Sequence, residues 1–256
     1  MRRLLERWAV FALAVVVWQA ATGAAADPFF PSPSTILRQM YRLWFSGPVS
    51  RLFLTDDALG NLLPSLLRLG LGFVAGSAVG VALGIAVGRS RWAYEFLDPV
   101  LQFFRAVPPP TLVPVFIVLF SLGPQMQVAS IVFSVLWPVL LNTADGARTV
   151  EPLQIETARA FRLTAAERLG FVIVPATLPK LFAGLRLALS LSLILMVFSE
   201  LLPGTANGIG FELTDAQSRS DLPTMWAAIV LLGILGYLLN TLLLVLERRV
   251  VHYGRS

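Results

Sequence analysis

The chain has 256 residues, of which 56% are hydrophobic and only 14% are charged, and its mean hydropathy is +0.75. Soluble domains carry about 25% charged residues, so this composition excludes an ordinary soluble domain and indicates a membrane protein in contact with the lipid bilayer. The net charge of +5 is interpreted as a topology signal, because basic residues border membrane spans, and no nucleic-acid partner is expected.

Uncharged runs divide the chain into segments that can cross a bilayer, which takes about 20 apolar residues. No charge occurs in residues 69–88, 106–144, 187–199 and 222–246. The run 106–144 is too long for one crossing, and the turn sequence SLGPQMQ divides it in two. We therefore expect an all-α integral membrane protein with a single transmembrane domain over 1–256 and six transmembrane helices, at 8–26, 66–88, 95–121, 126–144, 176–202 and 223–246.

The N-terminal segment fits two alternatives. The basic MRRLLERW, the apolar run after it and the small residues of GAAAD are typical of a cleavable signal peptide. The same apolar run also suits a first transmembrane helix, which is the interpretation we favour. Both alternatives leave the next segment, 27–61, outside the cell. Within it we expect a short interfacial helix over 34–45, after the extended PFFPSPS.

The basic residues predict the orientation of the spans. With a cytoplasmic N-terminus, fifteen basic residues fall on the cytoplasmic side and five on the outside, which is the bias of the positive-inside rule. The five outside are Arg38, Arg42, Arg51, Arg68 and Arg219. Both termini and the loop 151–168 are therefore expected in the cytoplasm, and the loop 203–221 is expected outside.

Glycines recur at every fourth residue of the second span, at Gly72, Gly76, Gly80, Gly84 and Gly88. Such a stripe of small residues lets two helix backbones approach closely in lipid. We favour packing within the chain, and a seam between two subunits is the alternative.

Prolines interrupt the third span at 108–110 and 114. They break the helix and free backbone carbonyls, which is tolerated where protein or a water-filled cavity covers them. A translocation path or a packed kink would each explain the cluster, so Pro108, Pro110 and Pro114 are candidate path residues. Glu200 ends the uncharged part of the fifth span and is either a border charge or a group facing an outer vestibule.

The charged segment between the fourth and fifth spans contains two helix starts. Pro152 suits a first helical turn with Glu151 before it as the cap, and this helix can run to about Phe161. Thr164 and Glu167 form a capping box that begins a second helix, which continues into the fifth span. On the first helix, small and charged side chains fit either a docking surface for a partner or an ordinary solvated loop.

The loop sequence ETARAFRLTAAERLGFVIVP at 156–175 resembles a motif of binding-protein-dependent ABC import permeases, written EAA-x3-G-x9-I-x-LP. Glu156, Thr157 and Ala158 stand at the EAA positions, Val172 at the isoleucine, and the pair 174–175 at the leucine and proline. The spacing of the motif is kept throughout.

Two of the departures from the motif matter. Thr157 replaces an alanine, which is a mild change. Arg162 replaces the glycine that makes the turn between the two helices in this family. If the turn needs a left-handed backbone, an arginine costs about 1 kcal/mol there. The alternative, which we favour, is a shifted or reshaped turn.

The resemblance extends over most of the chain from about residue 28, through FFPSPSTIL, RAVPPPTLVPVFIVLFSLG, AGLRLAL and NGIG. It is similar to the branch that imports sulfonates, taurine, nitrate and some pyrimidine or thiamine precursors. The resemblance implies a permease in the bacterial inner membrane, paired with a second permease subunit, identical or different, and served by an extracytoplasmic substrate-binding protein. It also implies that a cytoplasmic ABC ATPase docks on the coupling helix, at Glu156, Thr157, Ala158, Arg159, Ala160, Phe161 and Arg162.

The sequence excludes ATP hydrolysis by a Walker A motif, because that motif needs a lysine in a glycine-rich loop and the only lysine here, Lys180, lies in LPKLF. ATP and Mg²⁺ are therefore expected on the partner ATPase, with no cofactor, metal or catalytic residue in this chain. A membrane-embedded enzyme and a passive channel are the alternatives. The first lacks clustered titratable residues, since there is no cysteine and the only histidine, His252, lies in a basic tail.

Overall fold

The structure is a computed structural model that describes residues 2–25 and 29–251. These residues form helices and no strand, which confirms the all-α class. His252 and the end of the expected first span at residue 26 lie outside the described residues. The chain divides into two compact units, Met1–Pro64 with Ala206–Leu235 and Ser65–Thr205 with Gly236–Ser256.

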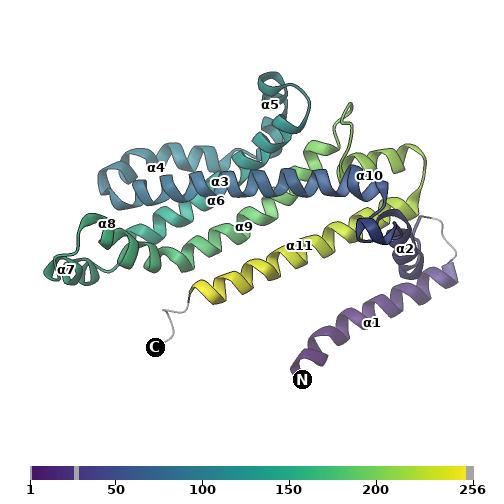
Figure 1. Cartoon of the computed structure of the whole chain (residues 1–256), viewed down its shortest axis with the longest axis horizontal. Helices are drawn as coiled ribbons and strands as arrows, with labels where there is room; N and C mark the ends of the chain where they lie inside the picture. The colour runs from purple at the N-terminus through teal and green to yellow at the C-terminus, as the bar shows by residue number, and fades with distance from the viewer. Residues whose placement is uncertain (1, 26–28, 252–256) are drawn as a thin grey trace. The chain divides into compact units, whose positions relative to one another are not determined.

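The first unit contains α1, the helices of the segment expected outside, and the beginning of α11 (Figure 1). Its elements are α1 (Arg2–Ala25), α2 (Pro33–Met40), the π-helical η1 (Tyr41–Phe45), the 3-10 turn η2 (Val49–Arg51), the π-helical η3 (Ala58–Leu62), α10 (Ile209–Ser218) and α11 (Leu222–Val250). The helix expected over 34–45 is thus present as α2 and η1, with Ser32 capping the backbone N–H of Thr35. Its position at an interface stays a prediction.

The core of the first unit includes a buried tryptophan and a buried carboxyl group. Trp44 is fully buried, and its Nε1–H donates to Oε2 of Glu212 on α10 at 3.3 Å. Burial raises the pKa of Glu212 to about 7, assisted by the negative charges of Asp57 and Asp215, while the hydrogen bond from Trp44 and the charge of Arg219 act in the opposite direction.

The second unit contains the candidate loop and most of the long helices. Its elements are the greater part of α3 (Leu63–Arg89), α4 (Arg91–Ala106), the 3-10 turn η4 (Pro109–Leu112), α5 (Val113–Phe120), α6 (Pro124–Arg148), α7 (Pro152–Ala160), α8 (Ala165–Arg168), the π-helical η5 (Leu169–Ile173), α9 (Val174–Glu200) and the end of α11. In Figure 1, α6 lies beside both α3 and α9.

The glycine stripe of α3 packs against α6. A Cβ atom added to Gly84 would lie 2.6 Å from the carbonyl oxygen of Leu140, and one added to Gly88 would lie 2.3 Å from that of Ala144. Real Cβ contacts are longer, so only glycine permits this approach. Packing within the chain is therefore confirmed for these glycines. Gly146 of α6 and Gly184 of α9 allow a similarly close approach between α6 and α9.

Within residues 2–25 and 29–251, four helices are long and apolar enough to cross a membrane: Ala58–Arg89, Pro124–Arg148, Ala165–Glu200 and Leu222–Val250. The expected third span is a broken pair, Arg91–Ala106 and Pro109–Phe120, bent by 86°, and would make a fifth crossing. The apolar helix Trp8–Ala24 is shorter. A total of six spans and the orientation of the termini therefore stay predictions.

Candidate functional site

The first helix of the candidate loop begins as expected. Pro152 occupies the first turn of α7, where its missing N–H has no helical partner to lose. Glu151 is the N-cap residue, but its side chain makes no capping hydrogen bond. The side chains at positions 156, 157 and 159–162 are exposed, whereas Ala158 is only 4% exposed. The small size of Ala158 therefore serves packing within the chain.

The turn after α7 lies at position 162, where the family motif has glycine. Arg162 has φ +57°, in the left-handed region. Its N–H donates to the carbonyl oxygen of Arg159 at 2.9 Å, and the N–H of Leu163 donates to that of Ala158 at 3.0 Å. This pair of bonds is a Schellman motif, which ends a helix through a left-handed residue. The favoured interpretation of a shifted or reshaped turn is wrong, because this motif requires the left-handed residue at position 162.

The second helix begins with the predicted capping box. The hydroxyl of Thr164 accepts from the N–H of Glu167 at 3.3 Å, and a carboxylate oxygen of Glu167 accepts from the N–H of Thr164 at 2.7 Å. Both free backbone donors are thereby satisfied. The Schellman motif and the capping box follow each other directly, so hydrogen bonds define the whole turn from Ala158 to Glu167.

A small apolar core attaches the loop to the long helices. Ala147, Val150 and Ile173 are buried together, and Ile155 of α7 and Val172 of η5 pack against them. Val172 stands at the isoleucine position of the family motif, so that position has a packing role here. The core fixes α7 against the start of the helix that leads into α9.

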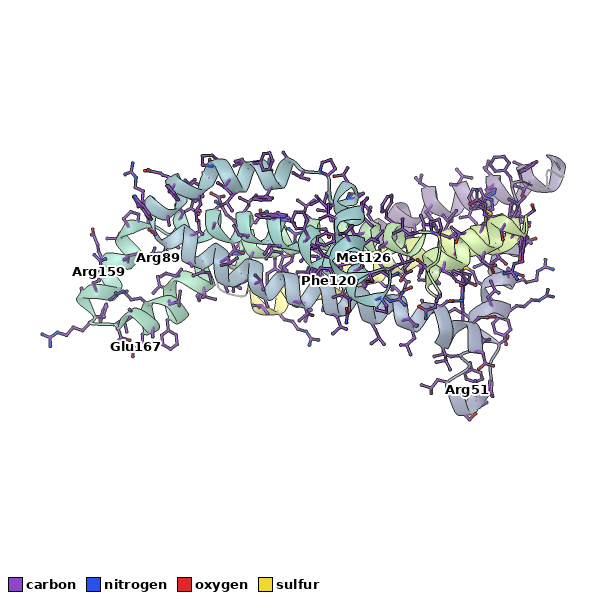
Figure 2. All side chains as sticks on the ribbon, turned by 90° about the horizontal axis from the view of Figure 1, so that it is seen from above. Arg51, Arg89, Phe120, Met126, Arg159 and Glu167 are labelled. Atoms are coloured by element: carbon purple, nitrogen blue, oxygen red, sulfur yellow. The ribbon has the colours of Figure 1, made fainter. Side chains whose placement is uncertain are left out.

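A groove of about 1140 Å³ lies between α7 and the start of α9. Leu153, Thr157 and Phe161 line one side, and Phe171 and Pro175 line the other. Phe161 is 78% exposed and Phe171 is 75% exposed. Figure 2 shows Arg159 and Glu167 at the same end of the second unit as Arg89, with Phe120 and Met126 toward the other end. The groove thus lies at the end where α3 terminates.

An ion pair and a cation–π contact at the base of the loop connect α6 to α9 and to α4. Nζ of Lys180 on α9 lies 2.6 Å from a carboxylate oxygen of Asp145 on α6 and donates to the hydroxyl of Thr149 at 3.1 Å. The guanidinium carbon of Arg148 lies 4.0 Å from the ring centre of Tyr94 on α4. Sequence reasoning missed these contacts, although Lys180 is the only lysine and Asp145 ends the longest uncharged run.

The prolines that the sequence indicated for a path form the bend between α4 and α5. Pro108 precedes η4, Pro110 lies in its first turn, and Pro114 lies in the first turn of α5. The carbonyl oxygen of Pro108 accepts from the N–H of Thr111 at 3.0 Å and from its hydroxyl at 2.7 Å. The break therefore satisfies at least this freed carbonyl locally.

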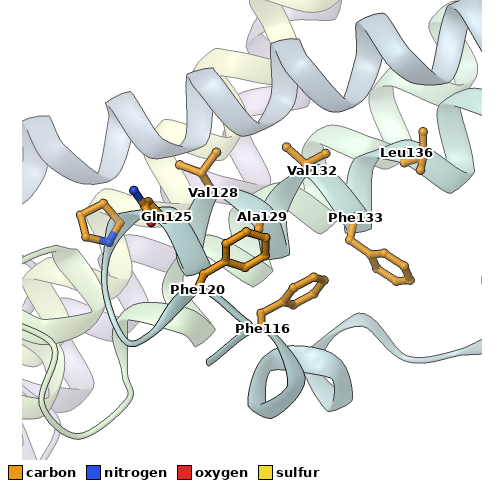
Figure 3. A pocket seen from close by; sticks show the side chains of 9 residues that line it. Phe116, Phe120, Gln125, Val128, Ala129, Val132, Phe133 and Leu136 are labelled. Atoms are coloured by element: carbon orange, nitrogen blue, oxygen red, sulfur yellow. The ribbon is translucent and has the colours of Figure 1, made fainter. Parts of the chain in front are cut away.

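Beyond the bend, α5 and α6 form an apolar groove of about 850 Å³. Figure 3 shows the rings of Phe116, Phe120 and Phe133 in this groove, with Gln125 at one end as its polar side chain. The groove is open and apolar, which suits contact with lipid, with another subunit or with part of a solute path.

Glu200 lies away from both grooves. Its side chain is 0% exposed, and one carboxylate oxygen lies 2.6 Å from a guanidinium nitrogen of Arg68. The hydroxyl of Ser65 lies 2.8 Å from each carboxylate oxygen. The sequence places Arg68 among the outside basic residues and indicates Glu200 as a border charge or a vestibule group. It does not predict their pairing, which joins the beginning of α3 to the end of α9.

Comparison with known proteins agrees with this arrangement. Residues 76–252 match the family model described as "Binding-protein-dependent transport system inner membrane component". The chain is 30% identical over 247 residues to the putative aliphatic sulfonates transport permease protein SsuC of Bacillus subtilis, covering 96% of this chain and 86% of the relative. It is 33% identical over 241 residues to the nitrate import permease protein NrtB of a Synechocystis strain, covering 94% and 86%.

The fold is also similar to a solved structure, that of the MetNI methionine ABC transporter in an inward-facing conformation. The TM-score is 0.63 at 19% sequence identity, over 77% of this chain and 99% of the compared chain. The loop motif, the helical fold and the match over residues 76–252 agree with one another. The chain therefore belongs to the family of binding-protein-dependent transport system inner membrane components, the permeases of ABC importers.

Proposed function

We propose that this permease is the membrane-spanning subunit of an ATP-driven importer, and that α7 with the turn after it docks a separate ATPase. The observation that carries the proposal is the hydrogen-bonded loop at 158–167, which presents the exposed Phe161 beside charged side chains, with the exposed Phe171 across the groove. Large apolar side chains on a water-exposed loop indicate a protein contact. The charges of Glu156 and Arg159 would select the partner and its register.

The cargo is proposed to be a small solute of the kind named for the relatives. Those names specify aliphatic sulfonates and nitrate, so a small anion is the first candidate. A binding protein would deliver it from the outside, and a second permease subunit would complete the path. ATP binding would move the docked loops and change which side of the membrane the path opens to, because nucleotide favours one of two conformations.

Within the chain, the bend at Pro108, Pro110 and Pro114 stays our candidate for part of the path. Helix breaks in membrane proteins are tolerated beside cavities and packed protein. Glu200 is proposed to hold α3 and α9 together instead of touching the solute, since its carboxylate is fully buried against Arg68. Removing one partner of such a pair is costly because it leaves a buried charge.

Charge reversal on α7 tests the docking proposal. Glu156→Arg should lower both co-purification of the ATPase and ATP-dependent uptake at least tenfold, because a like charge would face the partner's complementary surface. The permease should still insert in the membrane at normal level. Binding of the co-expressed ATPase to a tagged permease and uptake into proteoliposomes measure the two effects.

The matched control is Glu95→Arg, which reverses an exposed glutamate of α4 that pairs with Arg91. This variant should bind the ATPase and transport normally, since exposed ion pairs contribute little. Normal uptake by Glu156→Arg would reject docking through α7. Uptake without any ATPase would instead favour a passive channel, and turnover of a substrate by the purified permease alone would favour an enzyme.

A further inference from the structure

The helix formed by α2 and η1 carries two apolar stripes. The buried stripe consists of Ile36, Met40 and Trp44, and the exposed stripe consists of Leu37, Tyr41 and Phe45. Both stripes repeat every fourth residue, so each follows one face of the helix. The buried stripe accounts for packing in the first unit. The exposed stripe is not explained by packing within the chain.

Two arginines border the exposed stripe. Arg38 and Arg42 each follow a stripe residue by one position, and both are exposed. Neither makes an ion pair with another residue in the described part of the chain. An apolar face with aromatic residues and an adjoining basic edge is typical of helices that lie in the plane of a membrane surface.

Contacts with α11 place this helix at the level where a candidate span begins. Gln39 donates to the hydroxyl of Thr224 at 2.9 Å, and Thr224 lies in the first turn of α11. Two residues further along α11, Nε1–H of Trp226 donates to the carbonyl oxygen of Phe29 at 3.1 Å. The Trp226 ring lies 5.6 Å from that of Trp18. Tryptophans gather where a membrane span meets the headgroup layer.

The turn after the helix also presents apolar side chains. Val49, Leu52 and Phe53 are exposed, and Leu52 and Phe53 have φ angles of +54° and +65°. The N–H of Gly47 donates to the carbonyl oxygen of Phe53 at 2.9 Å and closes the turn. Figure 2 shows Arg51 on this turn, projecting from the helices. A strained backbone is thus held in place with apolar side chains facing outward.

We propose that residues 33–45 lie in the phospholipid headgroup layer where α11 begins, with the exposed stripe against the acyl chains and Arg38 and Arg42 bound to anionic lipid headgroups. The helix lies beside the first turn of the apolar α11, and its exposed stripe is apolar like the acyl chains. The two guanidinium groups, which form no ion pair with a described residue, are opposite in charge to lipid phosphate. The exposed stripe and its two arginines share no residue with the candidate docking loop at 151–168.

Spin labels on the full chain in phospholipid nanodiscs test the position of the stripe. The chain has no cysteine, so single cysteines in Leu37→Cys and Tyr41→Cys give unique labels. Gln217→Cys, at an exposed site near the end of α10, is the control. Collision with oxygen, which partitions into the acyl region, is compared with collision with a water-soluble nickel chelate.

Both stripe labels should show an oxygen-to-nickel collision ratio at least three times that of the Gln217→Cys label. Equal ratios at all three sites would overturn the proposal, because the stripe would then face water and be open to a soluble partner such as a binding protein. A stripe label shielded from both reagents would also overturn it, since the stripe would then be covered by protein.

Brominated lipids test the two arginines. A fluorophore on Tyr41→Cys should be quenched more by brominated phosphatidylglycerol than by brominated phosphatidylcholine. Combining Arg38→Gln and Arg42→Gln should reduce this preference, by about fivefold for each arginine removed. The control Arg51→Gln, whose guanidinium already pairs with Asp56, should leave the preference intact. An unchanged preference in the double variant would overturn headgroup binding by these arginines.

Discussion

Arg162 adopts a left-handed backbone that glycine adopts with less strain. Its φ is +57°, and the Schellman bonds of the turn require this conformation. A Cβ atom in the left-handed region costs about 1–2 kcal/mol. The chain thus has a left-handed residue at the position of the motif's glycine without the glycine, and the strain is concentrated in one exposed turn of the candidate docking surface.

Arg162→Gly should stabilise this turn by about 1 kcal/mol because it removes the Cβ strain. The amide protons at positions 162 and 163, which are hydrogen-bonded across the turn, should then exchange with solvent about fivefold more slowly. Arg162→Ala is the control, since it removes the charge and keeps the Cβ. Equal exchange in the glycine and alanine variants would show that the left-handed conformation carries little strain.

Glu212 should make the stability of the protein depend on pH. Its folded pKa of about 7 lies above its ordinary value of 4.5, so the folded protein holds the proton more tightly than the unfolded chain. The stabilising contribution is fully present below pH 4.5 and is lost as the pH rises through about 7. The thermal midpoint in detergent should therefore fall between pH 5 and pH 7.5.

Glu212→Gln should flatten this part of the pH profile, because glutamine does not titrate and can still accept a hydrogen bond from Trp44 through its amide oxygen. Asp56→Asn is the control, since the Asp56 side chain is 91% exposed, and its profile should match that of the unchanged protein. A Glu212→Gln profile as steep as the original would assign the pH dependence to other groups.

The pairing of α3 with α6 depends on the absence of side chains along one helix face. Gly84→Ala should lower the free energy of unfolding of the solubilised protein by about 1–3 kcal/mol, because the new methyl group would overlap Leu140 and Thr143. Gly70→Ala lies on the same helix with no heavy atom within 4 Å of the added Cβ. It should be neutral or stabilising, since alanine favours the helix. Equal stability of the two variants would contradict close packing at Gly84.

Most elements could be predicted from the sequence, because hydropathy and helix signals act locally. The helices α3, α6, α9 and α11 begin and end within four residues of the expected spans 66–88, 126–144, 176–202 and 223–246. The prolines indicated a break in the third span but not its angle. The angle depends on how α4, η4 and α5 pack against α6. The π-helical turns η1, η3 and η5 have no sequence signal that we could identify.

The candidate site was predictable where its chemistry is local. The helix starts at Pro152 and at the Thr164–Glu167 box follow from neighbouring residues. The inward position of Ala158 could not be predicted, because it depends on packing between the loop and other segments of the chain. The Arg68–Glu200 pair joins residues 132 positions apart, a contact that helical periodicity does not indicate.

At the scale of the whole molecule, the predicted orientation can be tested by labelling from one side. Single cysteines in Ala166→Cys, in the candidate docking loop, and in Gln217→Cys, near the end of α10, lie at exposed sites. In intact spheroplasts a membrane-impermeant maleimide should label only Gln217→Cys, because fifteen of the twenty basic residues favour a cytoplasmic loop. Both should react after permeabilisation. Labelling of Ala166→Cys in intact spheroplasts would contradict the predicted orientation.

The helix Ala165–Glu200 is continuous over 36 residues and is therefore about 54 Å long. One end begins with the capping box beside the candidate docking surface, and the other end carries Glu200, bound to Arg68 of α3. If such a rod tilts as a rigid body by about 5° around its midpoint, each end moves by about 2 Å, in opposite directions. A displacement of the loop would thus move the buried ion pair by a similar distance in the opposite direction.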